Sequence, residues 1–157
     1  MSMGIYNFHF GKIINFKFIM LMSKYSIPFK ILSTNHIIID AVVNNVAGKF
    51  LIDTGASNSC IDLNKLEKFK LKFEKSYETA SSATGEIYET YISKKNSFLI
   101  GGCSKTDFDL ILFDMKSVTQ ALKEKDKIEV DGIIGSDILI EFNSQIDYMK
   151  NEITLEF

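Results

Sequence analysis

Short runs of alternating apolar and polar residues dominate the chain and predict β-strands. The clearest run, HIIIDAVV from His36 to Val43, is rich in β-branched residues, which favour strands. Asn44-Asn45 follows it and predicts a hairpin turn, because asparagine tolerates positive φ. A returning strand is expected from Val46 to Asp53. The second strand of this hairpin therefore ends on an acidic residue.

Further strands are predicted on both sides of this hairpin. A pair is expected at residues 77–82 and 86–92, joined by the small polar turn Ala83-Thr84-Gly85, where glycine permits a tight bend. Gly101-Gly102 predicts a break. The other expected strands are Tyr25–Leu32, Phe108–Phe113, Gln145–Tyr148 and Ile153–Phe157, the last two forming a hairpin around Lys150-Asn151.

Helical spacing is confined to short segments. The strongest is Ser117 to Lys125, with Ser117 as its expected N-cap. A second helix is expected from Asp137 to Phe142, capped by Ser136 and with an acidic residue in its first turn. Leu63 to Phe69 fits one or two helical turns. Short strands at regular spacing with few helices predict an all-β barrel or sandwich.

The first 22 residues stand apart from this pattern. Ile13 to Met22, IINFKFIMLM, is apolar but interrupted by a lysine, and it is too short to span a bilayer. A secretory signal needs an uninterrupted apolar region and a small-residue cleavage site, and Ser23-Lys24-Tyr25 is a poor one. We therefore expect an N-terminal extension at 1–22, a domain at 23–157, no stable membrane span and a cytoplasmic location. Met22 is an alternative start.

Composition adds few constraints. A length of 157 residues fits one domain with a real core. The net charge of −2 gives no electrostatic case for a nucleic-acid partner. Cys60 and Cys103 lack metal-ligand spacing and are expected to be reduced thiols. We expect neither a metal nor a cofactor.

Candidate chemistry gathers at Asp53-Thr54-Gly55-Ala56-Ser57, which follows the apolar run Phe50-Leu51-Ile52. A carboxylate at a strand end is held rigidly and is partly desolvated, so its pKa can be tuned. Glycine allows a close approach of the backbone, whose N–H can bond the carboxylate. Small residues leave room for a substrate backbone. A lone Asp-Gly would be a turn cap, but Asp-Thr-Gly-Ala after an apolar strand is expected by chance in roughly one chain in a thousand of this length.

Other chemistry has weaker support. His36 precedes a strand and is expected to be a turn residue, since no acid or cysteine stands at ligand spacing. A hydrolase built on Cys60 and His36 has no support from the pattern. Gly101-Gly102 lacks the lysine of a phosphate loop. The acids Asp40, Asp62, Asp109 and Asp131 fit turns or strand ends, and Asp137 fits a helix start.

Asp53-Thr54-Gly55-Ala56-Ser57 after a hydrophobic run resembles the active-site signature of aspartic proteases. The family's second mark is two apolar residues and a glycine late in the chain, here Ile133-Ile134-Gly135. The single Asp-Thr-Gly resembles the single-domain, retroviral-type (retropepsin-like) branch, and the resemblance covers about Tyr25 to Phe157. It implies a closed β-barrel with one or two short helices and an active site at a homodimer interface.

The resemblance also implies roles for residues. Asp53 from each of two chains would form a carboxylate pair that activates water to hydrolyse a peptide bond, so the partners would be a second copy and a peptide or protein substrate. Thr54 would bond across the dimer axis, Gly55 would offer its carbonyl to substrate, and Ile134-Gly135 would support the loop. The expected supporting residues are Thr54, Gly55, Ala56, Ser57, Ile134 and Gly135, and the expected flap residues are Ser82, Ala83, Thr84 and Gly85.

The chain departs from the retroviral pattern in places. Retroviral enzymes carry an acid two residues after the motif's glycine and an arginine just after the late glycine. Here Ser57 and Ser136 stand there, so that salt bridge is missing. An extra segment, Ser117 to Lys127, makes the chain more similar to cellular or bacterial members. The alternative function is a catalytically silent dimeric module that binds peptides or proteins on the same fold.

Overall fold

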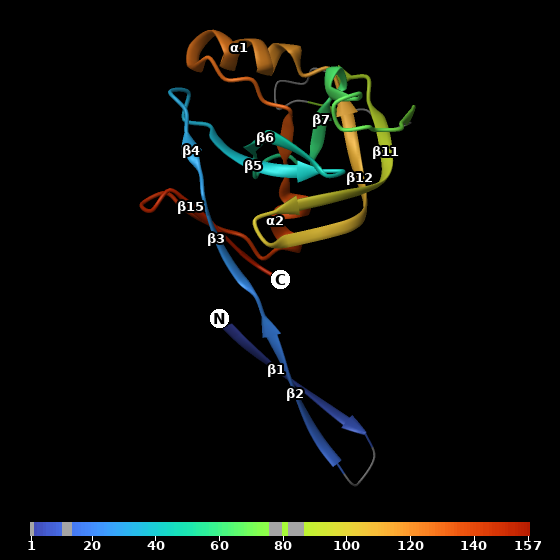
Figure 1. Cartoon of the computed structure of the whole chain (residues 1–157), viewed down its shortest axis with the longest axis vertical. Helices are drawn as coiled ribbons and strands as arrows, with labels where there is room; N and C mark the ends of the chain where they lie inside the picture. Colours follow the sequence, from blue (N-terminus) through green and yellow to red (C-terminus); the bar gives the residue numbers. More distant parts are fainter. Residues whose placement is uncertain (1, 11–13, 76–79, 82–86) are drawn as a thin grey trace.

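Six strands of the described chain close into a barrel in the computed structural model, which describes residues 2–10, 14–75, 80–81 and 87–157. Figure 1 shows the barrel in the upper part of the view. In order around the barrel the strands are β5 (Ile37–Val43), β6 (Val46–Ile52), β13 (Gly132–Ile134), β7 (Cys60–Asp62), β12 (Cys103–Phe113) and β11 (Tyr91–Ile100).

The barrel closes where β11 pairs with β5, at Phe98 opposite Val43 and Leu99 opposite Val42. This closure leaves no free edge around the ring, which removes the open edges that invite aggregation. Two short strands lie beside it: β4 (Lys30–Ile31) pairs with β5, and β8 (Glu74–Lys75) pairs with β11. The expected barrel is confirmed.

The predicted hairpin of β5 and β6 is confirmed. Asn44 and Asn45 form its turn with φ of 49° and 64°, the left-handed conformation that asparagine tolerates. The expected strand Tyr25–Leu32 is divided in two, because Pro28 ends β3 (Lys24–Pro28) before β4 begins. The strand expected at Phe108–Phe113 is the second half of the longer β12.

Strand β13 is inserted between β6 and β7, which are neighbours in sequence. It runs parallel to β6, with Ile134 opposite Ile52, and antiparallel to β7, with Ile133 opposite Cys60. The chain from β6 to β7 therefore has to pass over the end of β13. This crossing sets the geometry of the candidate site.

The core of the barrel is built from aromatic and branched side chains. Phe50 is fully buried and packs against Phe98 and Phe69, with ring centroids 5.8 and 6.1 Å apart. A second cluster under α1 (Lys116–Asp126) contains Leu122 and Leu51. Helix α1 lies across the upper end of the barrel in Figure 1.

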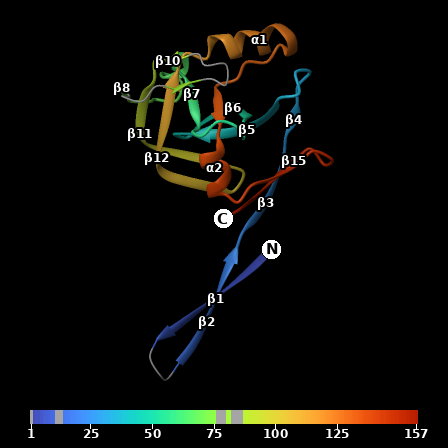
Figure 2. The same cartoon turned by 180° about the vertical axis from the view of Figure 1, so that it is seen from behind.

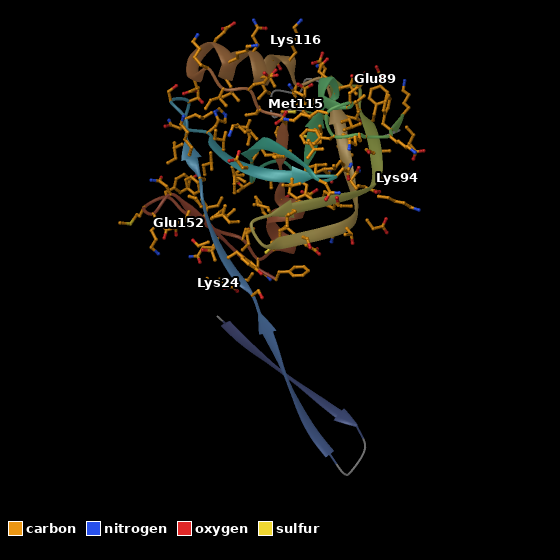
Figure 3. All side chains as sticks on the ribbon, viewed as in Figure 1. Lys24, Glu89, Lys94, Met115, Lys116 and Glu152 are labelled. Atoms are coloured by element: carbon orange, nitrogen blue, oxygen red, sulfur yellow. The ribbon has the colours of Figure 1, made fainter. Side chains whose placement is uncertain are left out.

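Both predicted helix caps are wrong. Lys116 begins α1, and its N–H donates to Asp114, so Ser117 lies inside the first turn. Met115, which Figure 3 labels beside Lys116, is buried at the N-cap position. The 3₁₀ helix η2 (Leu63–Lys65) forms at the expected third helical segment.

Helix α2 (Ser136–Glu141) also begins one residue before the expected start. Gly135 is its N-cap, and the hydroxyl of Ser136 bonds a distant carbonyl instead of capping the helix.

The two ends of the domain meet in a three-stranded sheet of β14 (Gln145–Asp147), β15 (Glu152–Glu156) and β3. The expected C-terminal hairpin is thereby confirmed. Figure 3 labels Lys24 and Glu152 toward opposite ends of the β3–β15 pairing. Tyr25 and Ile27 of β3 lie over the Gly101-Gly102 turn, where added Cβ atoms would come within 2.1 and 2.5 Å of them.

The first residues form a hairpin of their own. Strands β1 (Ser2–Phe10) and β2 (Ile14–Met22) pair with each other over their whole length, and neither pairs with another described strand. Figures 1 and 2 show this hairpin pointing away from the barrel. The sequence pattern did not indicate these strands, and the domain boundary after Met22 stays a prediction.

Within the described residues, no helix has the length and apolar character needed to cross a membrane.

Candidate active site

The loop at residues 53–59, called the Asp53 loop below, connects the end of β6 to the start of β7 and crosses the end of β13. Ile52 and Cys60 flank the loop, and both are held in register beside β13. The barrel topology, more than local sequence preference, therefore determines where this loop lies.

Asp53 is held through its backbone and its side chain. Its N–H donates to the Ile134 carbonyl at 3.0 Å, and its own carbonyl accepts from Ala56 N–H at 3.2 Å. Its Oδ1 accepts from Gly55 N–H at 2.9 Å. The side chain is nevertheless exposed in the single chain. Asp53 thus presents a carboxylate in a fixed orientation that remains accessible.

The other residues of the motif line the outer side of the loop. Thr54, Gly55 and Ser57 are exposed in the single chain, and Ala56 is half-buried. A Cβ on Gly55 would lie 3.2 Å from the Asp53 carboxylate, so glycine keeps this approach open. The structure brings the whole predicted motif together on one loop.

Ile134 and Gly135 lie directly under the loop. Ile134 is fully buried. A Cβ added to Gly135 would come within 2.7 to 2.8 Å of the backbone at Asn58 and Ala56. Real Cβ atoms do not approach backbone that closely, so this crossing requires glycine.

Ser136 links the late motif to the Asp53 loop through hydrogen bonds to backbone carbonyls. Ser136 donates to the Ala56 carbonyl twice, from its N–H at 2.8 Å and from its hydroxyl at 3.0 Å, and the hydroxyl is 3.4 Å from the Ser57 carbonyl. A neutral side chain therefore connects the late motif to the loop.

Sequence reasoning missed Ser59 and gave Asp137 too small a role. Ser59 is fully buried, and both its N–H and its hydroxyl donate to the Asp137 carboxylate. Asp137 lies in the first turn of α2, where an acidic residue is favourable, and it also accepts from Ile138 N–H. The signal for Ser59 was weak, since only its position just before a buried strand distinguishes it.

The remaining acids considered from sequence are engaged elsewhere. Asp131 is buried, accepts from Lys49 N–H at 2.8 Å and forms an ion pair with Lys68 at 2.7 Å. Asp62 is buried and accepts from the backbone of Asn64. On the surface, Asp40 pairs with Lys49, and Asp109 accepts from Lys95 N–H at 3.3 Å. These contacts give each acid a structural role.

A cysteine–histidine site is not assembled. Cys60 is buried in β7, and burial raises the pKa of its thiol to about 12. A nucleophilic cysteine needs the opposite shift. His36 is exposed just before β5, and its Nδ1 lies 2.9 Å from the Thr34 hydroxyl, which matches the predicted turn. Over the described residues, no group of three or more His, Cys, Asp or Glu side chains could hold a metal ion.

The predicted flap falls largely outside the described residues. Of the expected pair at 77–82 and 86–92, the described part is two residues on each side: β9 (Ala80–Ser81) and β10 (Ile87–Tyr88) pair antiparallel, with Ser81 opposite Ile87. The flap residues Ser82, Ala83, Thr84 and Gly85 lie outside the described ranges.

Comparison with known families decides the classification. The family described as "Aspartyl protease" matches residues 39–138, which is well over half of the chain and spans both the Asp53 loop and the late glycine. The chain belongs to the aspartyl protease family. Among curated proteins, no sequence matches it significantly.

Solved structures place this aspartyl protease in the retropepsin-like fold. A retropepsin-like aspartic protease from Rickettsia conorii is similar at 22% identity and a TM-score of 0.54, over 87% of this chain and 92% of that one. The EIAV protease, complexed with the inhibitor HBY-793, is similar at 18% identity and a TM-score of 0.53, over 70% and 90%. The retroviral protease-like domain of Ddi1 from Leishmania major is similar at 18% identity and a TM-score of 0.50, over 75% of this chain and 86% of that one.

Proposed function

We propose that this protein is a homodimeric aspartic endopeptidase in which Asp53 from each chain forms the catalytic pair. One carboxylate is ionised and takes a proton from water, while the other is protonated and polarises the scissile carbonyl. Two carboxylates in contact cannot both ionise cheaply, so they share one proton and titrate as a unit.

The observation that carries the proposal is the geometry of Asp53. Its carboxylate is exposed at the end of a buried strand, and bonds from Gly55 and to Ile134 hold its loop in place. A fixed but accessible acid can meet both water and a peptide. Family membership supports the same reaction.

The second carboxylate has to come from another chain. The motif occurs once in the sequence, and the acids Asp62 and Asp131 are buried in structural contacts. A symmetric dimer brings each residue of the interface against its own copy, so it supplies the partner. In such a dimer, exposed Thr54 would bond across the axis and Gly55 would bind the substrate. Residues Ser82 to Gly85 would form the flap over the substrate.

Cleavage of a peptide library tests the proposal. The dimeric wild-type protein is expected to cut peptides, and Asp53→Asn to cut none above background. Asp40→Asn is the matched control, because Asp40 is an exposed acid on β5 that contacts Lys49. Cutting by Asp53→Asn would contradict the mechanism, and a wild type that binds peptides without cutting would establish the silent module instead. The cytoplasmic location stays a prediction.

A further inference from the structure

A partly buried polar link ties the end of the Asp53 loop to helix α2. Ser59 is fully buried, and its hydroxyl donates to Asp137 Oδ1 at 2.6 Å. Its N–H donates to the other carboxylate oxygen at 2.8 Å. The pairing is bidentate, so it fixes orientation as well as distance.

Gly135 completes this link. Its N–H donates to the Ser59 hydroxyl oxygen at 2.9 Å, so that oxygen accepts from Gly135 while its proton goes to Asp137. A buried N–H without an acceptor is costly, and Ser59 provides the acceptor. The position of Gly135 therefore depends on Ser59, whose orientation depends on Asp137.

The residues on either side of Gly135 hold the first half of the loop. The Ile134 carbonyl accepts from Asp53 N–H, and Ser136 donates to the Ala56 carbonyl. Gly135 has little room toward the loop, since a Cβ added there would come within 2.7 Å of the Asn58 backbone. A shift of Gly135 would move Asp53 and Ala56 together.

We propose that Ser59 and Asp137 are positioning residues of the peptidase reaction, which set the place of the Asp53 carboxylate through Gly135. This inference rests on the proposed function. Neither side chain touches the substrate. A small displacement of a catalytic group costs rate more than binding, so the effect falls on kcat.

Paired variants test the proposal on the dimeric enzyme. Ser59→Ala and Asp137→Ala are expected to lower kcat about 10- to 100-fold while KM changes less than about threefold. Ser59→Thr keeps the hydroxyl and should stay within about threefold of wild type. Asp137→Asn keeps only part of the link, because its NH2 group has to face either Ser59 N–H or the donors on the other side, the Ser59 hydroxyl and Ile138 N–H. Its kcat should therefore fall, but less than that of Asp137→Ala. Should the threonine methyl prevent folding, the order of kcat among wild type, Asp137→Asn and Asp137→Ala decides the result.

The matched control is Ser93→Ala. Ser93 is also fully buried, but its hydroxyl contacts Asn96 within β11. It should lower stability while leaving kcat unchanged. The proposal would be overturned if kcat fell equally in Ser59→Ala and Ser93→Ala. It would also be overturned if kcat fell in neither Ser59→Ala nor Asp137→Ala.

Amide hydrogen exchange separates this proposal from the proposed function. The Gly55 and Ala56 amides donate within the loop, so they should exchange faster in Ser59→Ala and keep the wild-type rate in Ser93→Ala. A wild-type protein that cuts no peptide contradicts the proposed function alone. Unchanged exchange in Ser59→Ala would contradict the positioning role whether or not the protein cuts.

Discussion

The Asp53 loop and the hairpin of β1 and β2 are held in opposite ways. The loop has no regular structure, yet hydrogen bonds with Ile134, Gly135 and Ser136, distant in sequence, fix it at several points. The hairpin has a complete ladder between its own strands, and its described strands pair with no others. The position of Asp53 therefore depends on contacts between distant parts of the chain, whereas the described pairing of the hairpin is entirely local.

The largest expected effect is on Asp53 itself. Asp53→Asn should lower kcat/KM by about 10²–10⁴-fold, the usual effect of losing a positioned acid–base group. The fold should survive, because an amide oxygen can still accept from Gly55 N–H. Peptidase assays and thermal melts on the same sample measure both. Loss of activity through unfolding would show that the loop is less robust than its contacts indicate.

The second largest effect is expected at Ile134, which supports the Asp53 loop from below. Ile134 is fully buried beneath Asp53, so Ile134→Ala should lower the free energy of unfolding by about 2–5 kcal/mol. A urea titration measures this. An unchanged free energy of unfolding would mean that Ile134 does not support the Asp53 loop, and the contrast between loop and hairpin would fail.

A structural acid should respond differently from the catalytic one. Asp131→Asn leaves Lys68 without its charge partner, and Lys68 is partly exposed, so the loss should be about 1–2 kcal/mol. Activity should persist when the protein is assayed well below its melting temperature. An inactive but stable Asp131→Asn protein would identify Asp131 as a second functional acid.

The smallest effect is expected from the hairpin. Deleting residues 1–22 should change the free energy of unfolding by less than about 1 kcal/mol, because a lone two-stranded hairpin is marginal in water. Deleting 1–28 is the control, since it also removes β3, which pairs with β15 and covers Gly101-Gly102. Similar melting curves for the two deletions, or a large loss of unfolding free energy from deleting 1–22 alone, would show that the hairpin is integral to the fold.

What could be predicted from sequence was local or carried by the family motif. The β5–β6 hairpin followed from β-branched residues and Asn44-Asn45, which lie side by side along the chain. The Asp-Thr-Gly motif and the late glycine identified residues that the structure brings together.

The long-range parts could not be predicted. Ser136 resembled a helix cap, because nothing near it reveals a carbonyl 80 residues earlier in the chain. Ser59 likewise depends on Asp137, 78 residues away. The insertion of β13 between β6 and β7 creates both contacts, and that arrangement is a property of the closed barrel.

The central claim is that Asp53 works as a pair formed by two copies of the chain. Sedimentation and peptidase assays on the same dilution series test it most directly, with a mixed dimer of wild type and Asp53→Asn beside them. Specific activity should fall as the dimer dissociates. The mixed dimer should be nearly inactive, because its one remaining catalytic carboxylate has no partner with which to share a proton. A fully active monomer, or a mixed dimer with half the wild-type activity, would contradict the account.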